Sequence, residues 1–208
     1  HGGGMANDPL QTTTLVQPGG VPVLGEIGPY RLVEFLGRGG NALVYRACDA
    51  GQAEVALKVM HATPGMPPAE LQRFLREAET AKQLRQHPNI VTVYDAGRDG
   101  DHYYIAMTLV PGGRTLQNLA DGKLAVAEVL NLVLPVAEAL AFAHRAGVLH
   151  RDVKPANILL DQFGRPLLAD FGLAKAVSGP QLTITGTIMG TPCYMAPEQC
   201  GMGDGVVT

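Results

Sequence analysis

The sequence predicts an α+β fold of two lobes, in which a five-stranded antiparallel sheet with one helix precedes a mainly helical lobe. Short apolar runs bounded by Gly or polar clusters fill the first half of the chain and predict strands. One helical pattern interrupts them, and helical periodicity dominates after the PGG turn at residues 111–113. The 208 residues, 46% of them apolar, suffice for one sizeable core or two small lobes.

The first 26 residues are rich in Gly, Thr, Pro and Gln. They contain too little apolar surface to offset the entropy lost on ordering, so we expect a flexible leader and structure from about Ile27 onward. The five predicted strands are YRLVEFLGRGG (30–40), ALVYRAC (42–48), EVALKVM (54–60), IVTVYDAG (90–97) and HYYIAMTLV (102–110).

Residues 67–84 carry the helical pattern, with Phe74, Ala81 and Leu84 on one stripe. Glu77 falls within that stripe, whereas Glu79 lies roughly 200° further round the helix at about 100° per residue. We therefore expect Glu77 to face the protein interior and Glu79 to face water.

The most apolar long window, residues 124–144, also reads as a helix. Its interior contains Glu128 and Glu138, which favour a buried amphipathic helix over a membrane span, so no membrane segment is expected. Pro135 should kink this helix or remove one of its hydrogen bonds.

Composition excludes some classes of partner. A net charge of −3 and a pI near 6.1 argue against a nucleic-acid surface. Cys48, Cys193 and Cys200 form neither a CxxC pair nor an even disulfide set, which indicates free thiols in a reducing compartment. The first residues lack the pattern of a signal peptide, so a cytoplasmic location is expected.

Two features of the N-terminal half admit two interpretations each. The segment GRGGNALV (37–44) is either an ordinary hairpin turn or a loop whose backbone N–H groups cover phosphates. Lys58 is either a surface lysine with a buried stem or a buried cation that needs a partner. An inward-facing Glu77 would supply that partner.

Polar side chains crowd into HRDVKPANILL (150–160), which is followed by DFG at 170–172 and APE at 196–198. In this order, after a Gly-rich loop and a strand lysine, these segments resemble the eukaryotic-like (Hanks-type) protein kinase family, and most closely its bacterial serine/threonine branch. The resemblance covers residues 27 to about 204. It implies an N-lobe at 27–107, a hinge at 108–113 and a C-lobe at 114–208.

The resemblance implies a role for each motif residue. Asp152 would be the catalytic base, Lys154 would reach the γ-phosphoryl group, and Lys58, held by Glu77, would bind the α- and β-phosphates of ATP. Asn157 and Asp170 would hold Mg²⁺, with Mn²⁺ as the alternative ion. The nucleotide would also contact Leu36, Gly37, Arg38, Gly39, Gly40, Val44, Ala56, Met107 as gatekeeper, Thr108, Val110 and Leu159.

The family also implies partners. One class of partner is protein substrates that carry Ser or Thr. The other is a second copy of the chain, in a homodimer that autophosphorylates in trans. Thr183 and Thr185 are the candidate phosphosites, because a phosphate there could pair with Arg151 and order the loop.

The sequence departs from the family in several places, one of them Thr108, where the hinge often has an acidic residue. Ala42 replaces the third glycine of the loop pattern, which is a minor change. After APE only ten residues remain, whereas a kinase domain of the family continues through further helices, so we expect an incomplete C-lobe and a fragment of a longer protein.

Two other functions compete with an active kinase. A nucleotide-binding scaffold without catalysis predicts the loss of Lys58, Asp152 or Asp170, but all three are present. A small-molecule phosphotransferase of related fold is disfavoured by Lys154 and by the APE segment, which serve protein substrates in the family.

Overall fold

The computed structural model describes residues 15–16, 22–39, 42–62, 66–119, 124–171 and 194. The chain divides into two compact units. Unit 1 comprises residues 1–82 and 92–110, and unit 2 comprises residues 83–91 and 111–208.

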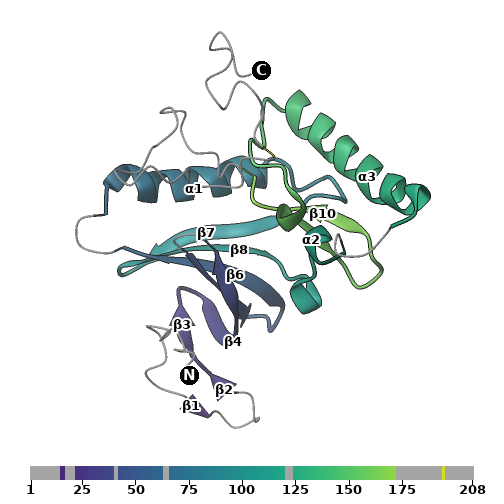
Figure 1. Ribbon diagram of the computed structural model, residues 1–208. Coiled ribbons are helices and arrows are strands. Elements are labelled where there is room, and N and C mark those ends of the chain that lie inside the picture. The colour runs from purple at the N-terminus through teal and green to yellow at the C-terminus, as the bar shows by residue number, and fades with distance from the viewer. Residues whose placement is uncertain are drawn as a thin grey trace, which may run out of the picture. The chain divides into compact units, whose positions relative to one another are not determined.

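Unit 1 is built on a six-stranded antiparallel sheet with the strand order β3-β4-β5-β6-β8-β7 (Figure 1). The strands are β3 (Gly25–Ile27), β4 (Tyr30–Gly39), β5 (Ala42–Cys48), β6 (Glu54–His61), β7 (Val93–Asp99) and β8 (His102–Thr108). A separate two-stranded ribbon pairs β1 (Leu15–Val16) with β2 (Pro22–Val23).

One helix, α1 (Pro68–Lys82), packs on β7 and β8. Phe74 is 2% exposed, and Ala81 and Leu84 are also buried, so the predicted apolar stripe is confirmed. Glu79 faces water as predicted, and its carboxylate pairs with Lys82 at 2.9 Å. That exposed i,i+3 pair adds only a few tenths of a kcal/mol, so burial of the stripe is what holds α1 in place.

The five predicted strands are present as β4 to β8, and β3 is a sixth strand that the sequence reading did not include. The expected start of structure near Ile27 needs correction, because β1, β2 and most of β3 lie within residues 1–26. Strand β3 pairs with β4 through its backbone, and its Ile27 is 2% exposed in the core of the sheet, with Leu24 packed against the same core. Gly28 makes the connecting turn at a φ of +55°, and its N–H donates to Asp99 Oδ2 at 2.8 Å.

Unit 2 contains two helices, two 3₁₀ turns and a hairpin within the described residues. Their bounds are η1 (Pro111–Gly113), α2 (Leu116–Leu119), α3 (Val126–Arg145), η2 (Pro155–Asn157), β9 (Ile158–Leu160) and β10 (Pro166–Leu168). The pair β9–β10 is antiparallel, and α3 packs on β10.

Residues 83–91 were assigned to the N-lobe from the sequence, but they group with unit 2. The His87 ring lies 5.2 Å from the Phe142 ring on α3. The Asn89 side chain donates to the Pro166 carbonyl at 2.8 Å, and the Leu168 N–H donates to the Asn89 carbonyl at 2.8 Å. These contacts join segments far apart in sequence, which local patterns do not reveal.

Helix α3 is continuous from Val126 to Arg145 through Pro135. As expected of an amphipathic helix, it buries one side through Val136, Ala139 and Ala143, while apolar residues such as Leu130 and Leu134 are exposed. By length and composition it is apolar enough to cross a membrane, with a mean hydropathy of 1.8 over its most apolar window. Core helices of soluble proteins meet the same criteria, so this observation decides nothing about a membrane.

Candidate active site

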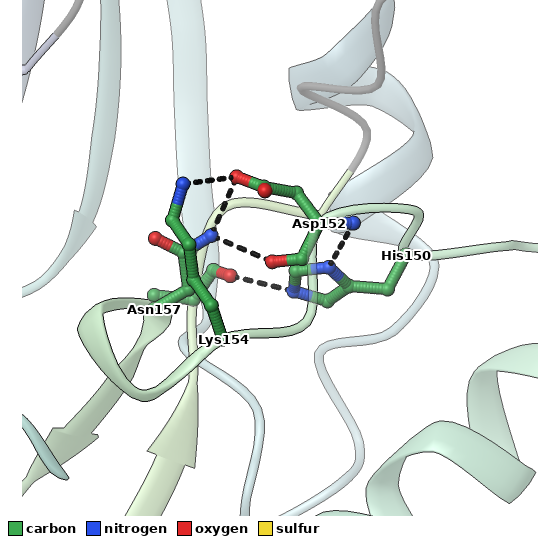
Figure 2. Close-up of polar contacts among 5 residues, drawn as sticks. His150, Asp152, Lys154 and Asn157 are labelled. Carbon is green, nitrogen blue, oxygen red and sulfur yellow. Dashed lines mark hydrogen bonds and ion pairs between the residues drawn. The ribbon is translucent and has the colours of Figure 1, made fainter. Parts of the chain in front are cut away.

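The Asp152 carboxylate is the centre of a hydrogen-bonded cluster in unit 2 (Figure 2). Lys154 Nζ lies 2.8 Å from Asp152 Oδ2, and Asn157 Nδ2 lies 2.9 Å from the same oxygen. Asn157 Nδ2 also donates to the backbone carbonyl of Asp152 at 2.8 Å. Lys154 and Asn157 therefore hold the carboxylate of Asp152 within one short loop, and the catalytic roles assigned to these three residues stay predictions.

The turn η2 explains why this loop closes on itself. Pro155 occupies the first turn position, where its fixed φ is favourable and its missing N–H costs nothing. The Asn157 N–H donates to the Lys154 carbonyl at 2.9 Å, which brings the amide back beneath Asp152. Asn157 is 7% exposed, so its position is set by packing as well as by hydrogen bonds.

His150 holds the start of the loop, and it received no role from the sequence. It is 1% exposed, and its Nε2 lies 2.8 Å from the Ala169 carbonyl. Because a carbonyl only accepts, Nε2 carries the hydrogen, and the bare Nδ1 accepts the Asp152 N–H at 3.3 Å. The ring also lies 4.7 Å from the Phe171 ring. Neutral His150 therefore links the loop of residues 150–157 to the segment after β10.

Burial lowers the pKa of His150 below its usual 6.5. In the unfolded chain His150 binds a proton once the pH falls below about 6.5, whereas in the folded chain it stays neutral to a lower pH. The free energy of unfolding therefore decreases as the pH drops from about 6.5 to the folded pKa of His150. We expect His150→Phe to lower the free energy of unfolding at pH 7.5 by about 1–3 kcal/mol through its lost hydrogen bonds. The variant should also lose less stability than the wild type between pH 7 and pH 5.5.

Thermal unfolding measured across this pH range tests the prediction. Burial and the neighbouring His61 also lower the pKa of His102, so His102→Gln serves to separate that contribution. An unchanged pH slope in His150→Phe would show that His150 does not titrate as its burial requires.

Asp170 follows Ala169, whose N–H donates to the Asn157 carbonyl at 2.9 Å. Asp170 and Arg151 adopt positive φ angles of 60° and 61°, which are uncommon for residues other than glycine. Such conformations concentrate at functional sites.

The Asn157 amide and the Asp170 carboxylate fit a divalent cation. The Asn157 amide nitrogen is engaged with Asp152, so its Oδ1 is the atom left to act as a ligand. An amide oxygen and a carboxylate suit Mg²⁺ or Mn²⁺. No cluster of three or more His, Cys, Asp or Glu able to hold a metal occurs within the described residues.

Unit 1 brings several of the predicted nucleotide contacts onto one sheet face. Gly37 lies opposite Val44, and Val44 lies opposite Lys58. Directly opposed residues share a face, and so do residues two apart on a strand, which adds Ala56 to the row. Met107 lies opposite Ala56. The prediction that Lys58 is buried is confirmed, since it is 9% exposed in the middle of β6.

The remaining predicted positions divide into two groups. Leu36, Arg38 and Gly39 lie on β4, Thr108 ends β8, Val110 is 7% exposed, and Leu159 lies on β9 in unit 2. Outside the described residues lie Gly40, the Glu77 side chain, Thr183, Thr185, Gly172 and the APE segment. The Lys58–Glu77 pair therefore stays a prediction.

Sequence reasoning missed two contributors to these sites. His150 was quoted with its motif, but only its burial and its contact with Ala169 reveal a structural role. Ile105 lies opposite Lys58 on β8 and is 5% exposed, so it covers the same sheet face. Nothing local distinguishes Ile105 from other apolar strand residues.

Comparisons with known proteins agree with this geometry. The protein kinase domain family model matches residues 30–204. Bacillus subtilis serine/threonine-protein kinase PrkC is 39% identical over 178 residues, which cover 85% of this chain and 27% of that protein. Mycobacterium tuberculosis serine/threonine-protein kinase PknL is 42% identical over 177 residues, which cover 84% of this chain and 44% of that protein.

Solved structures of protein kinase domains are also similar to this chain. The crystal structure of the Mycobacterium tuberculosis PknI kinase domain is similar with a TM-score of 0.63 and 40% identity, over 73% of this chain and 62% of that chain. The chain thus spans less than half the length of the curated relatives named above. With the family model matched across most of its length and the catalytic loop folded as described, the chain belongs to the protein kinase domain family.

Proposed function

We propose that this chain transfers the γ-phosphoryl group of ATP to serine or threonine hydroxyls of proteins. The observation that supports the proposal best is the Asp152 carboxylate held by Lys154 and Asn157. Phosphoryl transfer needs little covalent help, so a positioned proton acceptor and positioned cations supply most of the catalysis. The curated relatives PrkC and PknL carry the name serine/threonine-protein kinase.

Asp152 would accept the proton of the substrate hydroxyl. Among the described residues both donors, Lys154 and Asn157, bond to Oδ2. Oδ1 is therefore the oxygen that a substrate hydroxyl would approach, while the two donors fix the orientation of the carboxylate. Lys154 uses one of its three N–H groups on Asp152, and the others could donate to an oxygen of the γ-phosphoryl group.

Asn157 and Asp170 would hold the divalent cation, for which we propose Mg²⁺, with Mn²⁺ as a substitute. When bound, such an ion neutralises charge on the phosphates. Lys58, on the sheet face described above, would bind the α- and β-phosphates, with Glu77 as its ion-pair partner. The buried position of Lys58 supports this role, because an ammonium is desolvated there only when it interacts with groups of opposite charge.

Transfer from radiolabelled ATP to a generic basic protein tests the proposal. We expect label on serine or threonine in the presence of Mg²⁺. A chain that binds ATP but transfers no label to any protein would contradict the proposal and favour a nucleotide-binding scaffold.

We also propose autophosphorylation at Thr183 and Thr185, between two copies of the chain. Incubation with Mg-ATP followed by mass spectrometry should find phosphate on this segment, at a rate per molecule that rises with protein concentration. A rate independent of concentration would exclude transfer between copies. Phosphate confined to other segments would contradict both candidate sites.

A cytoplasmic location is part of the same proposal. The proposed reaction uses ATP as its cosubstrate, and the cytoplasm supplies ATP. Cys48, the one cysteine within the described residues, is a free thiol.

A further inference from the structure

His61 and His102 lie opposite each other on neighbouring strands of the unit 1 sheet. They are direct partners in the antiparallel pairing of β6 with β8 (Figure 1). The next pair along, Ala62 and Asp101, is of the hydrogen-bonded kind, because the Ala62 N–H donates to the Asp101 carbonyl at 2.8 Å. Since the two kinds alternate along antiparallel strands, His61 and His102 form a non-hydrogen-bonded pair, in which the side chains approach each other most closely.

The two imidazole rings are separated by the distance that two ligands of one metal ion require. Their centres lie 4.8 Å apart, with an angle of 42° between the ring planes. Two rings that each place one nitrogen about 2.0–2.1 Å from a tetrahedral zinc ion have centres roughly 5 Å apart. His61 is exposed and His102 is half-buried, so an ion can reach the pair from solvent.

A backbone contact determines which nitrogen of His102 is able to bind an ion. The ring forms a hydrogen bond with the Asp99 backbone that favours the protonated ring, so a ring N–H donates to the carbonyl. In the neutral ring the other nitrogen then keeps its lone pair. Histidines that bind metals are commonly held in this way, with the second ring nitrogen donating to a carbonyl or a carboxylate.

The charge around the pair also favours a cation. Burial and the neighbouring His61 lower the pKa of His102, so its ring is neutral near pH 7 and can act as a ligand. The carboxylates of Asp99 and Asp101 act on the same ring in the opposite direction. They make the surroundings of the pair negative, which attracts a divalent ion.

We propose that His61 and His102 together bind a divalent transition-metal ion such as Zn²⁺, which would cross-link β6 to β8. Imidazole suits Zn²⁺, Cu²⁺ and Ni²⁺, whereas the oxygen ligands proposed at Asn157 and Asp170 suit Mg²⁺. No group of three possible ligands occurs in the part of the chain that the structure describes, and the pair is accordingly a site with two imidazole ligands. We expect a dissociation constant for Zn²⁺ on the order of 10 µM, far weaker than that of structural zinc sites with four ligands.

Isothermal titration calorimetry of the full chain with Zn²⁺, in the absence of nucleotide, tests the proposal. The wild type should bind one ion that His61→Gln and His102→Gln bind at least about tenfold more weakly, because loss of a ligand costs at least as much as loss of its hydrogen-bond partner. Zn²⁺ should also raise the unfolding temperature of the wild type more than that of either variant, since the two rings meet only in the folded chain.

His144→Gln is the matched control, because His144 is exposed in the last turn of α3 and should leave the zinc affinity unchanged. With Cu²⁺ as the probe, electron paramagnetic resonance should report two imidazole nitrogens in the wild type and one in each single variant. Equal zinc affinities in the wild type and in the variants would show that the two rings only pack together, and would overturn the proposal. A wild type that binds no zinc would overturn it as well.

Either single variant is sufficient for the comparison if the other does not fold. The titration contains no nucleotide, so its result is independent of the proposed kinase activity.

Discussion

Replacing Asp152 by Asn is expected to lower the rate of phosphoryl transfer at saturating ATP by roughly 10²–10⁴-fold, the usual contribution of a general base. Asparagine has nearly the same shape as aspartate, and its amide oxygen can still accept from Lys154 and Asn157. What the variant loses is the capacity to accept the substrate proton. ATP affinity should therefore change little, and initial rates with radiolabelled ATP and a basic protein measure the effect.

Asp101→Asn is the matched control for this experiment. Its carboxylate is 73% exposed and lies 3.9 Å from Arg98, an ion pair too long and too solvated to matter much. The control should transfer phosphate at the wild-type rate. If Asp152→Asn retained more than a tenth of the wild-type rate while the protein stayed folded, another group would have to accept the proton.

Phe74→Ala is expected to lower the free energy of unfolding by about 3–5 kcal/mol, the usual cost of truncating a buried phenylalanine. The ring is 2% exposed on the face of α1 that packs on β7 and β8. Its removal leaves a cavity that the surrounding sheet can fill only in part, so both the transfer of the ring to water and the cavity contribute. Urea unfolding followed by circular dichroism measures the change.

Phe163→Ala provides the comparison. Phe163 is 73% exposed at the turn between β9 and β10, where the Arg165 guanidinium lies 5.2 Å from the centre of its ring. An exposed cation–π contact contributes about 0.5–1 kcal/mol at most, so this variant should lose no more than that. Equal losses in the two variants would mean that α1 is not anchored by Phe74.

Because Glu77 follows Phe74 on α1, the first variant also tests activity. When α1 packs less firmly on the sheet, the Glu77 carboxylate is held less firmly near Lys58. The proposed contact of Lys58 with the phosphates of ATP should therefore weaken. We expect the KM for ATP to rise in Phe74→Ala at temperatures where the variant is still folded, and to remain at the wild-type value in Phe163→Ala.

Local patterns in the sequence were sufficient for much of the fold. Phe74, Ala81 and Leu84 recur at helical spacing, and burial follows directly from that spacing. The strands from Tyr30 to Thr108 alternate or run apolar between turn residues, which predicts their positions within a few residues. The missing strand, β3, has only three residues, which are too few to show a side-chain period. It is held by backbone pairing with β4 and by burial of Ile27.

The loop around Asp152 could also be predicted from the sequence, because its residues lie close together in the chain. Asp152, Lys154 and Asn157 lie within six consecutive positions, and a turn that begins with proline is enough to bring them together. Residue type, order and spacing therefore led from the sequence to the Asp152 cluster and its chemistry.

Other features depend on contacts between distant segments. Residues 83–91 join unit 2 through bonds such as that from Asn89 to Pro166, 77 positions apart. His150 is held by the Ala169 carbonyl, and the Thr108 hydroxyl accepts the Thr92 N–H, 16 positions away. Periodicity and motif spacing report which faces are apolar and which side chains are neighbours along the chain. They carry no information on which distant backbone group completes a given hydrogen bond, because that depends on how the elements pack.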